Sequence, residues 1–473
     1  MSKNLILSLV VFYVTQPVLV MAQFAVSASA ISSVLINSAE ENQQDRLKIK
    51  FSAVSQSAAD SALGLKTDDQ TNFKMAINAG QTNPLGEDSA SKLTLRLQSL
   101  NSDGDLMLAI PEGYVEWGTA LRTTIGRKVT TFSEVDRALD MGVINPVLTV
   151  DQIRAEQQGI MGAHFQQSWN EFSMQFSAMG LYLPNQAPGV REDGGRLVAA
   201  NRWASTPPEK LKFNNELKDI NYKIQDIDYA KIINHQGFVA GLGWQFQQSA
   251  VKASYGRLPL NDVVIQREIF ADLEVRPQVL LSPVVTYQDV FTADFTFETG
   301  PVLTTIGLVQ SNPDNQAAPG KLETQKISAS TTYAIVAEYP LHQEESFIRS
   351  LSLAAAETRG GEIEDINSTG GKSDFILTPQ RFKFNKPVQL KAMVSLWEGR
   401  VQKVFADIKF IYDREQQGSL LDTEINYHTA LAGLVLEAGV TVVGVSEENS
   451  DDKRFLFQSQ VNDRVYGGIS YEF

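Results

Sequence analysis

The chain ends in Arg464-Val-Tyr-Gly-Gly-Ile-Ser-Tyr-Glu-Phe473, and this stretch decides the fold. In an extended strand, successive side chains point to opposite faces. The apolar face of this strand would carry Val465, Gly467, Ile469, Tyr471 and Phe473. The mixed face would carry Arg464, Tyr466, Gly468, Ser470 and Glu472. The stretch therefore predicts a strand with one apolar side, rimmed by aromatic rings, and one polar side.

Such a strand is typical of transmembrane β-barrels, which have an apolar outer band, aromatic girdles and a polar interior. The terminal pattern places Tyr471 and Phe473 three and five positions after Gly468. This pattern resembles the C-terminal assembly signal of Gram-negative outer-membrane barrel proteins. The resemblance implies that the barrel assembly machinery reads these residues. The competing interpretation is an edge strand of a soluble sandwich that ends in Phe.

The beginning of the chain predicts export. A basic start is followed by an apolar run from Leu5 to Val20 and by small residues just before Gln23. This is the layout of a secretory signal peptide. We therefore expect a signal peptide at residues 1–22, an N-terminal segment at 23–46 that acts as a tether or a plug, and the barrel at 47–473.

The composition excludes several classes of protein. The chain has no cysteine, which excludes a disulfide framework, cysteine metal sites and a lipid-anchored cysteine. The net charge of -14 and the pI near 4.9 argue against nucleic acid as a partner. Hydrophobic residues make up 43% of the chain, and the mean hydropathy is -0.15. These values suit a barrel, in which only alternate residues meet lipid.

Alternation of apolar and polar residues recurs from Leu47 to the C-terminus. A period of two predicts strands with one buried or lipid-facing side. From Val279 to Phe297 the odd-numbered residues are apolar except Asp289, and the phase never slips. We therefore expect one long strand there, which projects beyond the membrane. The whole pattern predicts about 16–18 strands, with 18 preferred.

The connections are of two kinds that alternate. Short turns, for example Gly118-Thr119 and Glu437-Ala438-Gly439, alternate with long polar loops such as 130–159 and 184–234. Outer-membrane barrels have short periplasmic turns and long extracellular loops. The sequence thus predicts an all-β fold, a transmembrane antiparallel up-and-down β-barrel in the cell outer membrane of a Gram-negative bacterium. We expect no second domain.

A second resemblance lies in the strand pair Glu112-Gly-Tyr-Val-Glu-Trp117 and Thr123-Thr-Ile-Gly-Arg-Lys128. It is similar to a pair found in porin-like families, where an acidic-aromatic strand precedes one that ends in Gly-Arg-Gln. Lys128 replaces the usual amide here. The resemblance covers about a tenth of the chain and implies a porin-like barrel. It identifies no substrate.

Charged residues on the polar strand faces are candidates for the pore wall, because inward side chains meet the aqueous lumen. These candidates are Lys74, Arg96, Arg122, Lys128, Lys252, Asp294, Lys391, Lys403, Asp407 and Lys409. Because basic residues predominate on this wall and acidic ones in the loops, we expect a weak preference for anions.

The loop at 131–159 is rich in charge and has short helical patterns. In porins a loop of this kind folds into the lumen and narrows it. The candidates for such a constriction are Glu134, Asp136, Arg137, Asp140, Asp151 and Arg154. A solvated surface loop packed on its neighbours is an equally good interpretation.

The sequence favours neither catalysis nor metal binding. The four histidines, His164, His235, His342 and His428, are far apart in the chain, whereas a nucleophile needs a base within hydrogen-bond reach. The nearest arrangement to a site is an inward His428 beside Asn426 and Glu424. No spacing of His, Asp and Glu recurs on one strand face as metal ligands would. We expect no enzyme activity, no cofactor and no metal.

The leading prediction is a porin-like channel for passive diffusion of small hydrophilic solutes. The alternative is a plugged structural or binding barrel whose long extracellular loops engage a partner. Outer-membrane lipid and lipopolysaccharide are expected neighbours, and both a monomer and a homotrimer are compatible with the pattern. Fold analogy supplies much of this functional prediction.

Overall fold

The computed structural model describes residues 46–56, 59–60, 66–67, 70–82, 88–99, 106–187, 189–199, 203, 206–207, 209–213, 216–225, 227–270, 277–315, 322–340, 347–366, 380–446 and 454–473. The signal peptide expected at 1–22 and the segment at 23–45 lie outside these residues. Within the described residues, no helix is long and apolar enough to cross a membrane.

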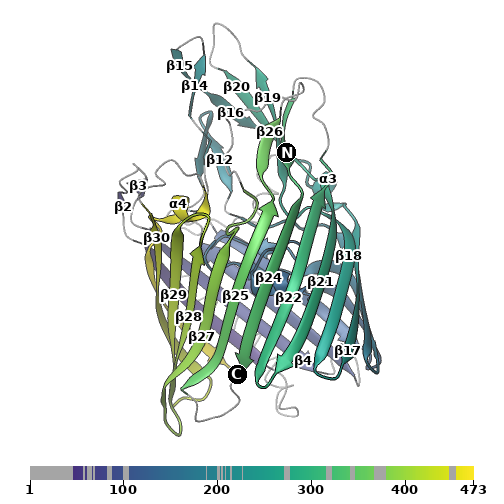
Figure 1. Ribbon diagram of the computed structural model, residues 1–473. Coiled ribbons are helices and arrows are strands. Elements are labelled where there is room, and N and C mark those ends of the chain that lie inside the picture. The colour runs from purple at the N-terminus through teal and green to yellow at the C-terminus, as the bar shows by residue number, and fades with distance from the viewer. Residues whose placement is uncertain are drawn as a thin grey trace.

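Eighteen antiparallel strands form a closed barrel (Figure 1). They are β1 (Arg46–Gln56), β4 (Gln70–Thr82), β5 (Ser89–Ser99), β6 (Leu106–Trp117), β7 (Leu121–Lys128), β10 (Ile160–Trp169), β11 (Phe172–Leu181), β17 (Gly237–Phe246), β18 (Ser249–Pro259), β21 (Tyr287–Thr299), β22 (Val302–Pro313), β24 (Ser330–Pro340), β25 (Ile348–Gly360), β27 (Pro387–Glu398), β28 (Lys403–Asp413), β29 (Gly418–His428), β30 (Leu434–Val445) and β31 (Arg464–Glu472). The predicted fold class and the preferred strand number are confirmed.

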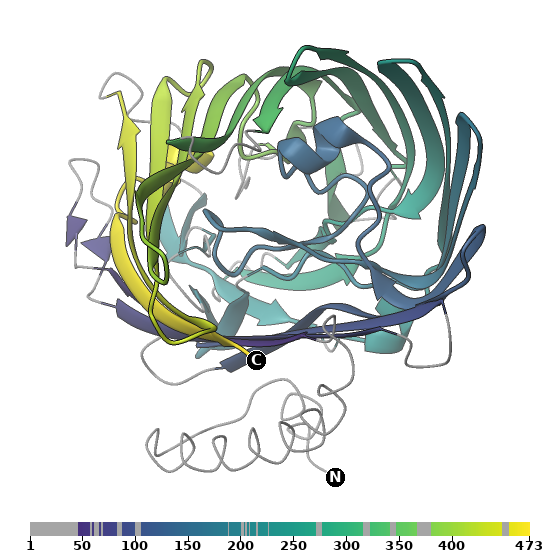
Figure 2. The ribbon, with the colours of Figure 1, turned by 90° about the horizontal axis from the view of Figure 1, so that it is seen from below.

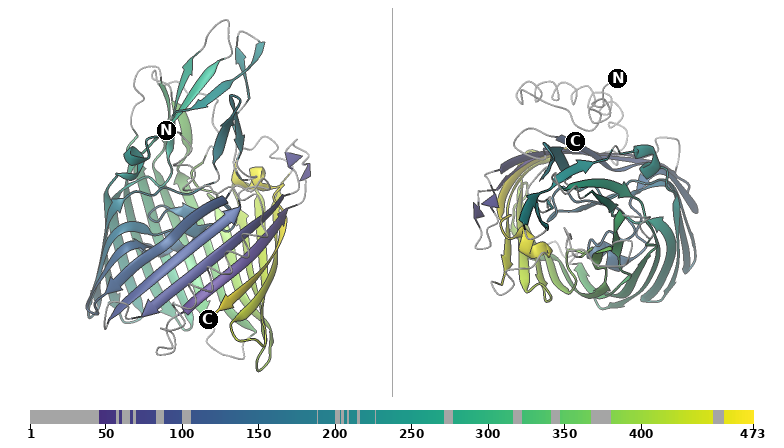
Figure 3. Two further views of the ribbon diagram at one scale, coloured as in Figure 1. Left: turned by 180° about the vertical axis from the view of Figure 1, so that it is seen from behind. Right: turned by 90° about the horizontal axis from the view of Figure 1, so that it is seen from above.

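The C-terminal strand closes the barrel. Strand β31 pairs with β30 on one side and with β1 on the other, at the seam between the yellow and purple strands in Figure 3. The register of β31 and β1 sets Lys48 opposite Glu472. The expected faces are present, since Val465 is 63% exposed on the outside while Tyr466 is buried on the inside. Because both edges of β31 are paired, the sheet closes on itself and leaves no open edge at this seam.

Outward side chains form the lipid-facing surface. Near the short turns, a girdle of exposed aromatic residues includes Trp117, Trp169, Phe172, Trp244, Phe246, Trp397, Tyr471 and Phe473. The Phe172 and Trp244 rings stack at 5.7 Å. Near the other end, exposed rings include Phe238, Tyr255, Phe291, Tyr333 and Tyr412. An apolar band between two aromatic girdles is the surface of an outer-membrane barrel.

Two strand boundaries differ from the prediction. The stretch from Val279 to Phe297 is two strands, β20 (Gln278–Val284) and β21, separated by Val285 and Thr286. Glu437-Ala438-Gly439 is not a turn, because it lies in the middle of β30. The chain turns instead after His428, where Gly433 has a φ of 82°.

The loop from residue 129 to 159, named the inward loop below, enters the barrel (Figure 2). It contains α2 (Glu134–Ala138), whose N-cap Ser133 accepts a hydrogen bond from the Asp136 amide, and the short strands β8 (Val147–Leu148) and β9 (Glu156–Gln157). Gly307 on β22 lets α2 approach the wall, because a Cβ there would collide with Val135.

The inward loop packs on one half of the wall, from β10 to β25, through a hydrophobic core. This core consists of Phe132, Val135, Val143, Ile144, Ile160, Met179, Tyr182, Val239, Leu258, Val285, Val290, Val309, Ala334, Ala356 and Phe382. The core fills this side of the lumen, which we name the filled half. The inward faces of β27 to β31, β1, β4 and β5 are mainly polar, and we name this side the open half.

The long loops build a second, smaller sheet outside the barrel, above it in Figure 1. This five-stranded sheet has the order β16-β20-β19-β23-β26. Its strands are β16 (Asn221–Ile224), β19 (Val264–Phe270), β20, β23 (Leu322–Ile327) and β26 (Ile363–Ile366). We name it the outer sheet. It was not expected from the sequence.

The remaining elements are short. They are β2 (Ala59–Asp60), β3 (Lys66–Thr67), β12 (Val190–Asp193), β13 (Arg196–Ala199), β14 (Lys210–Phe213), β15 (Glu216–Asp219), α3 (Tyr229–Ile233) and α4 (Phe455–Ser459). The pairs β12–β13 and β14–β15 are hairpins within the loop between β11 and β17.

Candidate transport path

Three cavities lie inside the barrel, in the open half and at its border with the filled half. The outer cavity, of about 530 Å³, is lined mainly by loop residues, among them Arg381, Lys383 and Phe455. The middle cavity, of about 570 Å³, is lined by Arg154 of the inward loop and by β22, β24, β25, β27, β28 and β29. The inner cavity, of about 530 Å³, is lined by periplasmic-side residues such as Lys48 and His428.

Neighbouring cavities share lining residues. Lys409 lines both the outer and the middle cavity. Arg154, Asp407 and Glu424 line both the middle and the inner cavity. The three cavities are therefore contiguous. Together they reach from the extracellular loops to the periplasmic end of the barrel, where the middle and inner cavities lie side by side.

The inward loop bounds this series with charged side chains that reach across to the open half. Near α2, the Asp140 carboxylate lies 3.5 Å from Lys409 Nζ and 3.9 Å from Lys391 Nζ. Asp140 has a positive φ of 52° just after the helix, a conformation that Asp tolerates better than most residues. Its ion pairs join the tip of the helix to strands β27 and β28.

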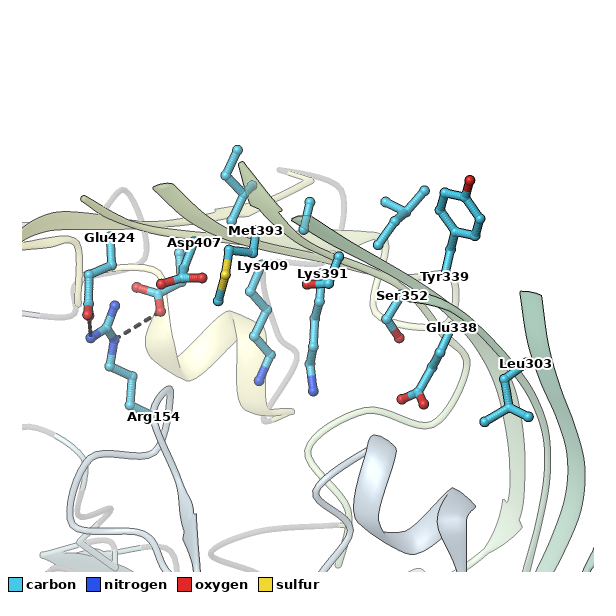
Figure 4. A pocket seen from close by; sticks show the side chains of 15 residues that line it. Arg154, Leu303, Glu338, Tyr339, Ser352, Lys391, Met393, Asp407, Lys409 and Glu424 are labelled. Atoms are coloured by element: carbon cyan, nitrogen blue, oxygen red, sulfur yellow. Dashed lines mark hydrogen bonds and ion pairs between the residues drawn. The ribbon is translucent and has the colours of Figure 1, made fainter. Parts of the chain in front are cut away.

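The second arm of the inward loop is fixed by more ion pairs. Arg154 lies 2.9 Å from Asp422 and also pairs with Glu424 and contacts the Tyr466 hydroxyl. Two further pairs hold the same arm, Asp151–Arg464 at 2.8 Å and Glu156–Arg96 at 2.6 Å. The loop is thus attached at both ends of the middle cavity, with open space between the attachments (Figure 4).

The wall of the middle cavity carries two levels of charge. Lys391 and Lys409 face each other in register on β27 and β28, at the outer level. Asp407 and Glu424 face each other on β28 and β29, at the inner level. Figure 4 shows both lysines reaching into the space between α2 and the arm that carries Arg154.

Several pore-wall candidates do not line the three cavities. Asp294 is buried beneath the inward loop, where it accepts hydrogen bonds from the Ser133 hydroxyl and the Glu134 amide. Lys252 donates to the Thr131 carbonyl in the same region. The expectation that these two face the aqueous path is wrong, because the inward loop covers them.

The other candidates are distributed along the barrel. Lys74 and Arg96 line the inner cavity. Lys128 pairs with Glu116, Lys403 lies 3.1 Å from Glu398, and Arg122 is exposed near the periplasmic end of β7.

The constriction candidates also divide. Asp136 is buried and accepts hydrogen bonds from the Val143 and Ile144 amides, so it shapes the loop and does not face the path. Burial raises the pKa of Asp136 despite these bonds. Arg137 lies 2.8 Å from Glu134 and 3.4 Å from Glu338 on β24. Asp140, Asp151 and Arg154 make the pairs described above.

Sequence reasoning missed the loop cations of the outer cavity. Lys383 donates to the Gln152 carbonyl at 2.7 Å, and Arg381 lies 3.2 Å from Asp262. Burial, and then the neighbouring Lys409 ammonium, lower the pKa of Lys383 to about 8. The alternation of Arg381, Lys383 and Phe382, Phe384 was a possible signal, but it lies in a stretch interpreted as a loop.

The described histidines lie on different parts of the barrel. His164 is buried against the Ser177 hydroxyl at 2.7 Å and the Ile160 carbonyl at 3.1 Å. His428 lines the inner cavity with its ring edge against Phe405, and His342 lies outside the described residues. Among the described residues, no group of three His, Asp or Glu is placed to hold a metal ion.

No family model matches the chain, and no curated protein matches it. Several solved structures are similar over most of their length. Salmonella typhi OmpF in complex with daunomycin is 10% identical, with 91% of this chain and 97% of that chain covered and a TM-score of 0.38. Pseudomonas aeruginosa OccK11 is 10% identical, with 91% and 95% covered and a TM-score of 0.45.

Pseudomonas aeruginosa OccK2 in complex with glucuronate is 12% identical, with 91% of this chain and 95% of that chain covered and a TM-score of 0.45. These likenesses concern the fold and not the solute. The closed ring of eighteen strands and its apolar outer band, between aromatic girdles, make this chain a porin-like barrel of the outer membrane.

Proposed function

We propose that the barrel is a passive channel for small hydrophilic solutes, with a weak preference for anions. The observation that carries the proposal is the series of three cavities joined by Lys409, Arg154, Asp407 and Glu424. A water-lined path bounded by fixed charges passes hydrated solutes and selects among them by size and charge. In this proposal the filled half narrows the path and solutes pass along the open half.

The anion preference rests on the outer end of the path. Lys383, Lys391 and Lys409 gather there, and the carboxylate within ion-pair distance of the last two is Asp140. Charges on a low-dielectric wall act strongly across a narrow path. Further inside, Asp407, Asp422 and Glu424 surround Arg154, which weakens the preference.

Single-channel recording on refolded protein in planar bilayers tests the proposal. We expect open channels of constant conductance and, across a KCl gradient, a reversal potential on the anion side. The variant Lys409→Gln should move the reversal potential toward cation preference. Arg122→Gln, which removes the same charge outside the three cavities, should move it less. Absence of conductance would overturn the channel proposal, and a clear cation preference would overturn the selectivity.

A second function is favoured by the outer sheet. Four separate loops contribute its strands, whereas a simple diffusion pore needs no ordered sheet outside the barrel. A binding barrel whose extracellular surface engages a partner would use such a platform. This alternative predicts folded, membrane-inserted protein that shows no conductance.

A further inference from the structure

The middle cavity holds opposite charges close together on one strand. Asp407 and Lys409 are two residues apart on β28, so both side chains leave the same face of the strand. Both line the middle cavity. Adjacent strands repeat the arrangement, with Lys391 beside Lys409 and Glu424 beside Asp407.

These two charges are incompletely compensated by the protein. Lys409 and Lys391 share a single carboxylate, that of Asp140, at 3.5 and 3.9 Å. Asp407 accepts a hydrogen bond from the neutral amide of Asn426 at 2.8 Å, and no cation of the described chain lies within ion-pair distance of it. Arg154, the nearest cation of the inward loop, pairs instead with Asp422 and Glu424.

We propose that the middle cavity recognises zwitterionic solutes that carry an ammonium and a carboxylate on one carbon, as α-amino acids do. This inference rests on the proposed channel function and names its solute class. The carboxylate binds the Lys391 and Lys409 ammoniums at the outer level, and the ammonium binds Asp407 at the inner level. Same-face residues of a strand are about 6.5–7 Å apart.

That separation suits a small zwitterion. Two charge-assisted hydrogen bonds of about 2.7–2.9 Å and one carbon between the two charged groups of the solute span a little more than this Cα spacing. The long side chain of Lys409 supplies the remaining reach. Figure 4 shows the open side of the cavity, beneath the two lysines and between α2 and Arg154, where such a solute would sit.

The test compares entry of labelled alanine, lactate and glycerol into proteoliposomes that contain the full chain. Glycerol entry measures whether the pore is open. Lactate entry measures how the pore treats a solute with a net negative charge, and alanine is the zwitterion with no net charge. The variants are Asp407→Asn and Lys409→Gln, with Arg122→Gln as a charge-matched control outside the cavities. A long-range potential acts on net charge, so it leaves alanine entry unchanged.

We expect alanine entry, relative to glycerol, to fall by about threefold in both cavity variants, the size of one partly exposed ion pair. Lactate entry should rise in Asp407→Asn and fall in Lys409→Gln. The control variant should leave alanine entry unchanged. If glycerol enters normally and alanine keeps its wild-type ratio in both variants, the zwitterion site is refuted while the channel stands. If wild-type protein passes no glycerol, the channel proposal fails and the site with it.

Discussion

The two halves of the lumen use opposite chemistry on the same backbone. In the filled half, inward positions such as Val290 and Val309 are buried against the inward loop. In the open half, the corresponding positions are Lys391, Asp407 and Lys409, which face a cavity. Apolar burial fixes the loop on the filled side. On the open side, ion pairs hold it together with a smaller apolar contact of Ile153 with β28 to β30. Stability and selectivity are therefore expected to reside in different halves.

The largest effect is expected at β31, the strand that closes the barrel in the open half. Deletion of residues 469–473 removes β31 partners of Lys48 through Phe51, and exposed strand edges are costly in lipid. We expect the truncated chain, and Phe473→Ser to a lesser extent, to be degraded or aggregated. Heat-modifiable protein in outer-membrane fractions measures assembly. Phe473→Trp keeps the aromatic ring and should assemble, and normal assembly of the deletion would contradict the role of the last strand.

A charge placed in the filled half should be the next largest effect. The side chain of Val135 on α2 is fully buried against the barrel wall. Val135→Asp would bury an unpaired carboxylate there, at a cost of about 3 kcal/mol or more. We expect a lower urea midpoint for unfolding. Met393→Asp makes the same kind of change at a cavity-lining position of the open half and should alter ion selectivity only. Equal losses of stability at the two sites would show that the halves do not differ.

A smaller effect is expected from pH. Because the pKa of Lys383 is lowered to about 8, its ammonium is charged below that pH and neutral above it. Anion preference should therefore decline as the pH rises through about 8. Reversal potentials at a series of pH values measure this. Lys383→Arg keeps its charge and should remove the step, whereas a step that persists in this variant would assign the titration to another group.

The smallest effect is expected at the tip of α2. Asp140→Asn releases Lys391 and Lys409 from their shared carboxylate and should raise the anion-to-cation permeability ratio by about twofold or less in ordinary salt. Glu134→Gln serves as the control, because it removes a carboxylate of α2 that pairs with Arg137. A ratio that falls in Asp140→Asn would contradict the arrangement of charges in the open half.

The sequence predicted the barrel because lipid imposes a strict alternation that tertiary contacts rarely disturb. It could not locate the break between β20 and β21, since the two residues of the gap, Val285 and Thr286, leave the odd–even phase unchanged. Gly439 was interpreted as a turn residue, but it lies in a strand and makes room for the Tyr466 ring. A glycine can mark a turn, or it can mark a strand position where a neighbouring side chain comes close to the backbone. The sequence alone does not distinguish these two cases.

The candidate site was harder to predict for a related reason. The alternation along each strand identified Lys391, Asp407 and Lys409 as inward-facing, because it depends only on the strand that carries them. It placed Asp294 and Lys252 on the pore wall as well, since parity carries no information about which part of the wall a distant loop covers. The charged loop was recognised, but its two buried anchors, Asp136 and Val135, look in the sequence like any helical pair.

The outer sheet has a consequence for recognition at the cell surface. Its strands come from four loops. The pair Lys326–Glu364, for example, joins β23 to β26, two segments that the barrel must first bring together. The surface they form is therefore a discontinuous epitope that exists only on the finished molecule. An antibody raised against the folded sheet would not bind peptides from the separate loops, and its binding would report that the barrel beneath is complete.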